Sequence, residues 1–284
     1  VHIHGNSALM SIELMSIKKS RTQAKTIVHA HNTDCTHRLL NKILYRYFIN
    51  NYDYAVACSR AAGEWIYKNN EYTVLNNGIN EKRFQYNPKI RTANREKNGI
   101  ADKFVVTHIG RFNSQKNHEF LIDIFKELSV RKENAVLRLV GEGDLKDKII
   151  AKVKEKGLSD KVCFVGETDN PEIEYNMADV FVLPSLYESF GIVNVEAQCS
   201  GLPCVISDTI PEDIKITENV VYLSLNESAE IWAETIMKYE NIQRKSFSDE
   251  AVKRGYSLKA NADNLLEIYK ICLLYTSPSP RDRG

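Results

Sequence analysis

The stretch "VFVLPSLYESFGIVNVEAQCSGLPCVISD", residues 180–208, contains two apolar runs separated by a loop and an amphipathic segment. The runs at 180–185 and 203–208 are mostly apolar, which is typical of strands buried on both faces of a parallel sheet. Between them, Gly191 permits a close backbone approach, and a helix is expected to begin at about Ile192. The stretch therefore predicts a strand–helix–strand unit of an α/β fold.

This alternation of strand and helix patterns continues along most of the chain. The segment "NHEFLIDIFKEL", for example, carries apolar residues at helical spacing and charge on its other face. The predicted strands lie at 25–31, 52–59, 72–78, 104–110, 135–141, 161–166, 180–185 and 203–208. The polar stretch 80–103 lacks a strand pattern, and a fresh series of strands follows it. We therefore predict a doubly wound α/β protein with two parallel sheets and a seam near Asn77 to Asn80.

The predicted seam divides the chain into unequal parts. Residues 1–77 are expected to form a partial N-terminal Rossmann-like domain, because "VHIHG" at its start reads as the tail of a buried strand. Residues 78–257 are expected to form a C-terminal Rossmann-like domain. The amphipathic stretch 258–274 predicts a helix that packs back towards the first domain, and 275–284 reads as a disordered or non-native tail.

Composition restricts the classes of partner and compartment. The 284 residues include 38 Lys and Arg against 37 Asp and Glu, so no overall positive field would attract nucleic acid. The six cysteines form no CxxC and no metal-finger spacing, which indicates reduced thiols and a cytoplasmic protein. No run of 18 apolar residues exists, so no transmembrane helix is predicted.

Two carboxylates bracket Gly191. Ligands of open parallel sheets bind at the carboxyl ends of strands, which places Glu188 in a ligand-contacting loop. The expected helix start offers free N–H groups and the positive end of a dipole to a phosphate. Glu196 lies about 7 Å further along that helix, at roughly 1.5 Å per residue. The spacing fits a nucleotide diphosphate sugar, with one acid on the sugar and one on the ribose; the alternative is two solvated acids.

Two cations follow the end of another predicted strand. Arg111 and Lys116 lie five apart in "GRFNSQKN", in a loop that leads into the next helix. Two cations could hold a diphosphate and stabilise the charge that develops as it leaves; the alternative is an ordinary pair of surface cations. No two aspartates lie two residues apart, so the DxD signature of metal-dependent sugar transferases is missing. We therefore expect no metal site and no cofactor.

These motifs resemble those of the retaining glycosyltransferases of family 4, which have the GT-B fold of two Rossmann-like domains facing a cleft. Glu188 and Glu196 match the E-x7-E signature. Arg111 and Lys116 match R-x4-K, and "NNGINEKRF" matches the seam motif. The resemblance extends to about Tyr269. It implies a first domain that is incomplete, because the family's first strand and glycine-rich loop would precede the first residue.

The resemblance also implies roles for individual residues. Arg111 and Lys116 would bind the donor diphosphate, and they form the implied catalytic set together with Glu188 and His31. The implied donor-binding residues are Gly110, Arg111, Lys116, Gly166, Glu188, Phe190, Gly191, Ile192 and Glu196. Of these, Glu188 would contact sugar hydroxyls and Glu196 the ribose. Glu142, Gly143 and the 165–166 pair could line the base pocket or be ordinary turns.

Histidines near the start of the chain add a second group of candidates. His31 ends the predicted strand "IVHAH", and the resemblance implies a histidine here near the reacting carbon and the acceptor; the alternative is a polar cap of the next helix. His29 is expected on the other face of the strand in a structural role. His4, in "HIHG", could also line the cleft.

The resemblance implies an enzyme that transfers a sugar, with retention, from a nucleotide diphosphate sugar that is UDP-linked to a glycan or lipid-linked acceptor. Its setting would be capsule or exopolysaccharide synthesis. One alternative is a GT-B epimerase or a phosphorylase, and the pyridoxal lysine environment that a phosphorylase needs is not recognisable in the sequence. The other alternative is a non-catalytic nucleotide-sugar-binding module.

A local basic surface leaves membrane contact open. The run 16–25 is basic, and Arg38, Lys42 and Arg46 share one face of a predicted helix at 37–48. This face could meet the cytoplasmic face of a membrane, as the resemblance implies for members with lipid-linked acceptors. The alternative is a solvated face, because the apolar side of the helix is expected to be needed for the core.

Overall fold

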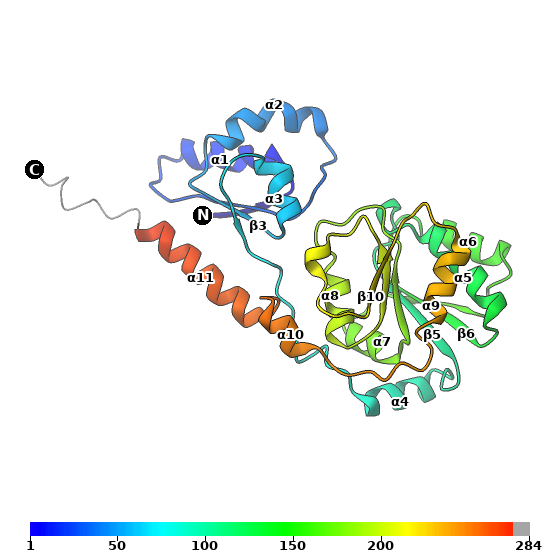
Figure 1. The fold of residues 1–284 in the computed structure, drawn as a ribbon. Helices are drawn as coiled ribbons and strands as arrows, with labels where there is room; N and C mark the ends of the chain where they lie inside the picture. The colour runs from blue at the N-terminus through cyan, green and yellow to red at the C-terminus, as the bar shows by residue number, and fades with distance from the viewer. Residues whose placement is uncertain (275–284) are drawn as a thin grey trace, which may run out of the picture. The chain divides into compact units, whose positions relative to one another are not determined.

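The structure is a computed structural model that describes residues 1–274 of the chain (Figure 1). The chain forms two compact units. Unit 1 contains Val1–Gly78 and the segment that begins at Gly255, and unit 2 is Ile79–Arg254. The predicted tail at 275–284 lies outside the described residues.

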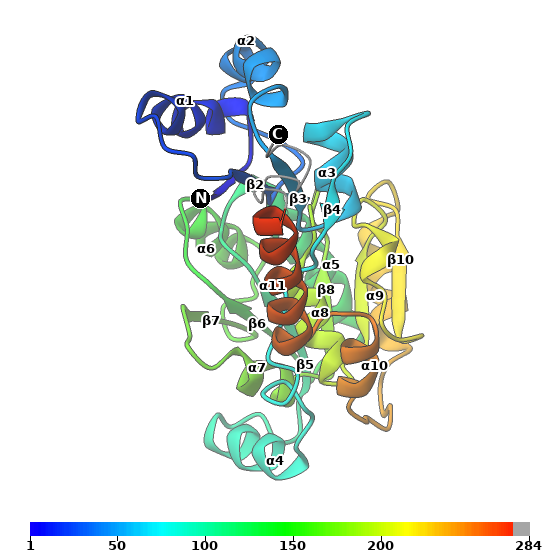
Figure 2. The same ribbon diagram turned by 90° about the vertical axis from the view of Figure 1, so that its left-hand side faces the viewer.

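Unit 1 is built on a four-stranded parallel sheet. Its strands are β1 (His2–Gly5), β2 (Ile27–Ala30), β3 (Tyr54–Ala57) and β4 (Thr73–Val74), in that spatial order. Its helices are η1 (Ala8–Met10), α1 (Ser11–Lys19), α2 (Arg38–Ile49), α3 (Arg60–Tyr67) and α11 (Leu258–Leu274). Figure 2 shows α11 as one continuous helix.

Two helices, α3 and α11, hold the sheet of unit 1. A buried apolar cluster joins the sheet to α11 through Ile27, Val56, Leu75 and Ile268. From α3, the buried Tyr67 directs its hydroxyl to the carbonyl oxygens of Val28 and Val56, each at 2.9 Å. A buried tyrosine needs such a partner for its hydroxyl, so these bonds fix α3 against the sheet.

Unit 2 contains a larger parallel sheet. Its strands are β5 (Phe104–Ile109), β6 (Ala135–Val140), β7 (Val162–Gly166), β8 (Val180–Leu183), β9 (Cys204–Ser207) and β10 (Val220–Leu223). Their spatial order is β10-β9-β8-β5-β6-β7. The helices are α4 (Pro88–Lys97), η2 (Ser114–Lys116), α5 (His118–Arg131), α6 (Lys146–Glu155), α7 (Pro171–Met177), α8 (Ile192–Cys199), η3 (Glu212–Ile214), α9 (Ala229–Met237) and α10 (Ser248–Lys253). The predicted α/β class with parallel sheets is confirmed.

Helices cover this sheet on two sides, as a doubly wound fold requires. Helices α5, α6 and α9 lie along one side of the sheet (Figure 1). The main core on this side includes the buried Trp232, Phe125 and Ile149. On the side of α7, Tyr175 packs edge-on against Phe181 of β8 at 5.8 Å between ring centroids. Burial on both sides explains why β5, β8 and β9 are apolar almost throughout.

Strand β10 and helix α4 are among the elements that the sequence analysis did not predict. The edge strand β10, "VVYL", has three partly exposed residues, so it lacks the solid apolar run of a central strand. Helix α4 lies inside the polar stretch 80–103. Pro88 occupies its first turn, and the Asn87 side chain accepts from the backbone N–H groups of Lys89 and Ile90. Capping therefore starts α4, and the ion pairs of Arg91 and Arg95 with Asp179 hold the helix where apolar periodicity is absent.

Candidate functional site

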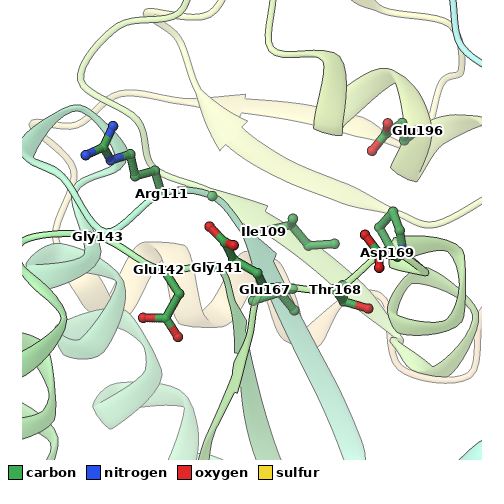
Figure 3. A pocket seen from close by; sticks show the side chains of 12 residues that line it. Ile109, Arg111, Gly141, Glu142, Gly143, Glu167, Thr168, Asp169 and Glu196 are labelled. Carbon is green, nitrogen blue, oxygen red and sulfur yellow. The ribbon is translucent and has the colours of Figure 1, made fainter.

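The carboxyl ends of β5, β6 and β7 border a cavity of about 740 Å³. The sheet order reverses between β5 and β8, which is where open parallel sheets bind ligands. The cavity is lined by Ile109, Gly110, Arg111, Val140, Gly141, Glu142, Gly143, Glu167, Thr168, Asp169, Pro171 and Glu196. Figure 3 shows Arg111 and Glu196 on opposite sides of it. One predicted cation and one predicted acid therefore share a single hollow.

The guanidinium of Arg111 lines the cavity and has only a weakly interacting carboxylate beside it. Its guanidinium lies 3.7 Å from a carboxylate oxygen of Asp144, and the two side chains are 68% and 88% exposed. Pairs this exposed interact weakly and are screened by salt. The guanidinium can therefore turn to an anionic ligand at small energetic cost.

Glycines allow the two loops beneath Arg111 to pack backbone against backbone. Gly141 has φ 134°, and a Cβ there would lie 2.3 Å from the carbonyl oxygen of Gly110. Gly143 has φ 152°, and its Cβ would lie 2.6 Å from the carbonyl oxygen of Phe112. No larger residue fits either position without movement of the facing loop. This approach builds the floor of the cavity.

Lys116 and Glu188 form a partly buried ion pair beside the cavity. Lys116 Nζ lies 2.6 Å from Glu188 Oε1, with side chains 13% and 6% exposed. Gln115 donates a further hydrogen bond to Glu188 Oε2 at 3.2 Å. The Lys116 stem runs against Gly110, where a Cβ would lie 3.1 Å from Lys116 Cγ. The two predicted residues thus meet each other next to a residue of the cavity wall, although neither lines the cavity itself.

The segment Phe190–Ile192 leads directly into α8. Gly191 caps the helix in the left-handed region at φ 69°, a conformation that glycine adopts without strain. No side chain caps the helix start. The free N–H groups and the positive end of the helix dipole are therefore available to an anion.

Glu196 lies in the second turn of α8 and reaches the cavity wall. Its Oε2 accepts a hydrogen bond from the Tyr175 hydroxyl at 2.9 Å. Burial raises the pKa of Glu196 to about 7, against the opposing effects of Tyr175 and the Arg83 charge. At neutral pH the Glu196 carboxyl therefore exists in both its protonated and its ionised form. The protonated form can donate a hydrogen bond, and both forms can accept one.

The loop after β7 supplies cavity residues that the sequence analysis passed over. Gly166 ends β7 at φ 83°, and a Cβ there would lie 3.4 Å from Glu142 Oε1. Beyond it, Glu167, Thr168 and Asp169 line the cavity. The signal that could have found them is the same one that singled out Glu188: polar residues that directly follow a parallel strand.

In unit 1, the structure places His31 in a cluster of histidines. His31 Nε2 lies 2.8 Å from His4 Nδ1, and its ring centroid lies 4.1 Å from that of His29. The expectation that His29 occupies the other face of the strand was wrong. Residues two apart on a strand point to the same face, so His29 and His31 are neighbours. Burial, followed by the His4 charge, lowers the pKa of His31.

Helix α2 differs from the expectation that its apolar side serves the core. Phe48 is its one fully buried residue, whereas Leu39 and Ile43 are 75% and 65% exposed. Arg38 and Lys42 are exposed on the same helix. The helix therefore presents apolar and basic side chains together to its surroundings.

The family model described as "Glycosyl transferases group 1" matches residues 90–258. This range includes every predicted donor-binding residue and covers more than half of the chain. The chain belongs to the group 1 glycosyltransferases.

Group 1 relatives match beyond this range. The chain is 32% identical over 261 residues to the Bacillus subtilis protein named "Putative glycosyltransferase EpsF", covering 86% of the chain and 68% of the relative. It is 26% identical over 253 residues to alpha-monoglucosyldiacylglycerol synthase of Acholeplasma laidlawii, covering 80% of the chain and 63% of the relative. The chain thus spans about two thirds of the length of these proteins.

Solved structures share the fold of this group 1 chain. HepE of Anabaena, determined in complex with UDP, matches with a TM-score of 0.78 at 19% identity, covering 95% of this chain and 78% of that one. Sucrose-phosphate synthase of Thermosynechococcus elongatus matches with a TM-score of 0.80 at 21% identity, covering 97% and 74%. These neighbours support the GT-B fold class. Within residues 1–274, no helix has the length and apolar character needed to cross a membrane.

Proposed function

We propose that this chain transfers a sugar, with retention of the anomeric configuration, from a UDP-sugar to a glycan or lipid-linked acceptor in polysaccharide synthesis. The observation that carries the proposal is the cavity at the switch point, lined by Arg111 and Glu196 and flanked by the Lys116–Glu188 pair. The family membership supports sugar transfer, and the UDP complex of HepE gives UDP as the candidate nucleotide.

The donor diphosphate would lie between Arg111 and the start of α8. The exposed guanidinium of Arg111 can form two charge-assisted hydrogen bonds to phosphate oxygens. The uncapped helix start contributes N–H donors. Lys116, held by Glu188, adds a second positive charge behind Gly110. These donors take the part of a metal ion, so we propose transfer that needs neither metal nor cofactor.

The two acids would orient the ends of the donor. Glu196 would accept hydrogen bonds from the ribose hydroxyls, because it lines the cavity with one oxygen held by Tyr175. Glu188 would contact the sugar hydroxyls from the loop between β8 and α8. Gly110 and Gly166 lie at strand ends beside this path and leave room for the nucleotide.

The leaving group is the nucleoside diphosphate. As the glycosidic bond breaks, negative charge grows on the diphosphate oxygen, where fixed donors lower the barrier because they need no reorganisation. The acceptor hydroxyl would attack from the face that the diphosphate leaves, and the departing phosphate would take the hydroxyl proton. His31, at the end of β2, would position the acceptor. We further propose that the α2 surface brings the chain to the cytoplasmic face of a membrane.

The decisive experiment measures UDP binding and UDP release in one sample. We expect the chain to bind UDP and to release it from a UDP-sugar when a lipid or oligosaccharide acceptor is present. The control is a chain carrying Arg111→Ala, which should bind UDP more weakly and release less of it at the same concentrations. Binding without release across a panel of UDP-sugars and acceptors would favour the non-catalytic binding module instead.

A further inference from the structure

Four imidazoles gather on one face of the sheet in unit 1. Strands β1 and β2 pair in parallel with His4 opposite His29. His2 and His31 lie two residues from these along their strands, so all four side chains project to the same face. The ring centroids of His2 and His4 are 4.1 Å apart, and those of His2 and His29 are 5.3 Å apart.

Three of these histidines have the arrangement of a metal-binding set. His2, His4 and His29 each offer one ring nitrogen, and the three nitrogens lie within 4.8 Å of one another. Among residues 1–274 this is the one group of three or more candidate ligands so arranged. Three imidazoles with an open fourth position form a known zinc coordination set.

Two of the rings are already held through their other nitrogen. His2 Nδ1 lies 2.9 Å from the Tyr269 hydroxyl of α11, and His4 Nδ1 lies 2.8 Å from His31 Nε2. Metal-binding histidines typically use one nitrogen for the ion and the other for such an orienting contact. These contacts use Nδ1 of both rings, which leaves the Nε2 atoms of His2 and His4 for a metal ion.

The third ring, that of His29, lacks a hydrogen-bond partner. His29 is 5% exposed, and neither of its ring nitrogens has a hydrogen-bond partner; Nε2 of His2 is likewise buried and unpartnered. Buried polar atoms without partners are rare in folded proteins. A bound metal ion would take up the lone pairs of these unpartnered ring nitrogens.

We propose that His2, His4 and His29 bind a divalent transition-metal ion of the zinc type, with Tyr269 and His31 orienting two of the rings. An all-nitrogen set selects zinc and its neighbours over magnesium or calcium, which prefer oxygen. At zinc–nitrogen distances of about 2.0–2.1 Å the ligand nitrogens must approach by roughly 1.5 Å, which side-chain rotation can supply. The three ligands share no residue with the donor cavity, whereas His31, which orients His4, is also the residue proposed to position the acceptor.

The test uses the 284-residue chain without a polyhistidine tag. Titration with Co²⁺ should give the visible d–d absorption of a low-coordinate ion at one equivalent, and Zn²⁺ should displace it. His2→Gln and His4→Gln should each weaken Zn²⁺ binding by about 100-fold or more, and Tyr269→Phe by about 10-fold. The matched control is His37→Gln, which removes an exposed histidine outside the cluster and should change nothing.

His29→Gln should abolish binding, but its buried position could also destabilise the sheet, so the exposed His4 and half-exposed His2 decide the matter. Two results would overturn the proposal. One is the absence of saturable binding at one ion per folded chain. The other is an unchanged Zn²⁺ affinity in both His2→Gln and His4→Gln, which would assign the ion to the chain terminus or the surface.

Discussion

Glu196 is a carboxyl group that the fold keeps partly protonated at neutral pH. Its surroundings are the buried Tyr175 hydroxyl and the second turn of α8, and burial raises its pKa from 4.5 to about 7. Between these values the folded chain retains a proton that the unfolded chain has lost. The free energy of unfolding therefore falls as pH rises through this window, and the loss is complete above pH 7.

Replacement of Glu196 by Gln should remove this pH dependence. The amide oxygen can still accept from Tyr175, whereas the buried charge disappears. The unfolding free energy of Glu196→Gln minus that of the original chain should rise by about 2–3 kcal/mol from pH 5 to pH 8. Urea unfolding at both pH values measures it. An equal difference between the two chains at pH 5 and pH 8 would show that the carboxyl is not perturbed by burial.

The Lys116–Glu188 pair offers a second test at the scale of single residues. Its 2.6 Å contact is largely shielded from water, so removal of one partner leaves a charge without compensation. Lys116→Met should lower the unfolding free energy by about 3 kcal/mol, and Lys116→Met combined with Glu188→Gln should recover most of that loss. Denaturant unfolding of the two variants gives the comparison. Additive losses would mean that the two side chains act independently.

At the scale of elements, prediction from the sequence succeeded where burial imposes a pattern. The eight predicted strands correspond to β2 through β9, and β2, β8 and β9 among them are buried throughout. It failed at β10, which is a partly exposed edge strand, and at α4, which local capping starts in a polar stretch. It also misjudged α2, whose apolar residues Leu39 and Ile43 are exposed instead of buried.

That exposed surface of α2 carries the prediction of membrane contact. Apolar side chains insert into the lipid boundary, and each nearby basic residue contributes about 1 kcal/mol on an anionic membrane. Arg38→Gln with Lys42→Gln should therefore weaken sedimentation with phosphatidylglycerol vesicles roughly 30-fold, and Leu39→Ser with Ile43→Ser should weaken it as well. The control is Leu266→Ser, an exposed leucine of α11. Equal sedimentation of all variants would restrict α2 to a solvated role.

At the scale of the whole molecule, sequence spacing identified residues but not their contacts. The strand-end rule selected Arg111, Lys116 and Glu188 as candidates, and the spacing along the expected helix added Glu196. It could not show that Lys116 is paired with Glu188. The two residues are 72 apart in the sequence, and they meet only because β5 and β8 are neighbours in the sheet. It also could not give the perturbed pKa of Glu196, which depends on burial by distant segments. The grouping of the histidines likewise depends on the register between β1 and β2, which the sequence alone does not give.

The most direct test of the central claim is calorimetric titration of UDP into the chain and three variants. The donor-site account predicts that Arg111→Ala weakens UDP binding roughly 10- to 100-fold, because a charge-assisted contact of about 1.5–3 kcal/mol is lost. Glu196→Ala should weaken it less, by roughly 3- to 10-fold. Arg131→Ala, which removes an exposed cation of α5 paired with Glu127, should bind as the original chain does. Superimposable titration curves for all four chains would contradict the assignment of this cavity to a nucleotide sugar.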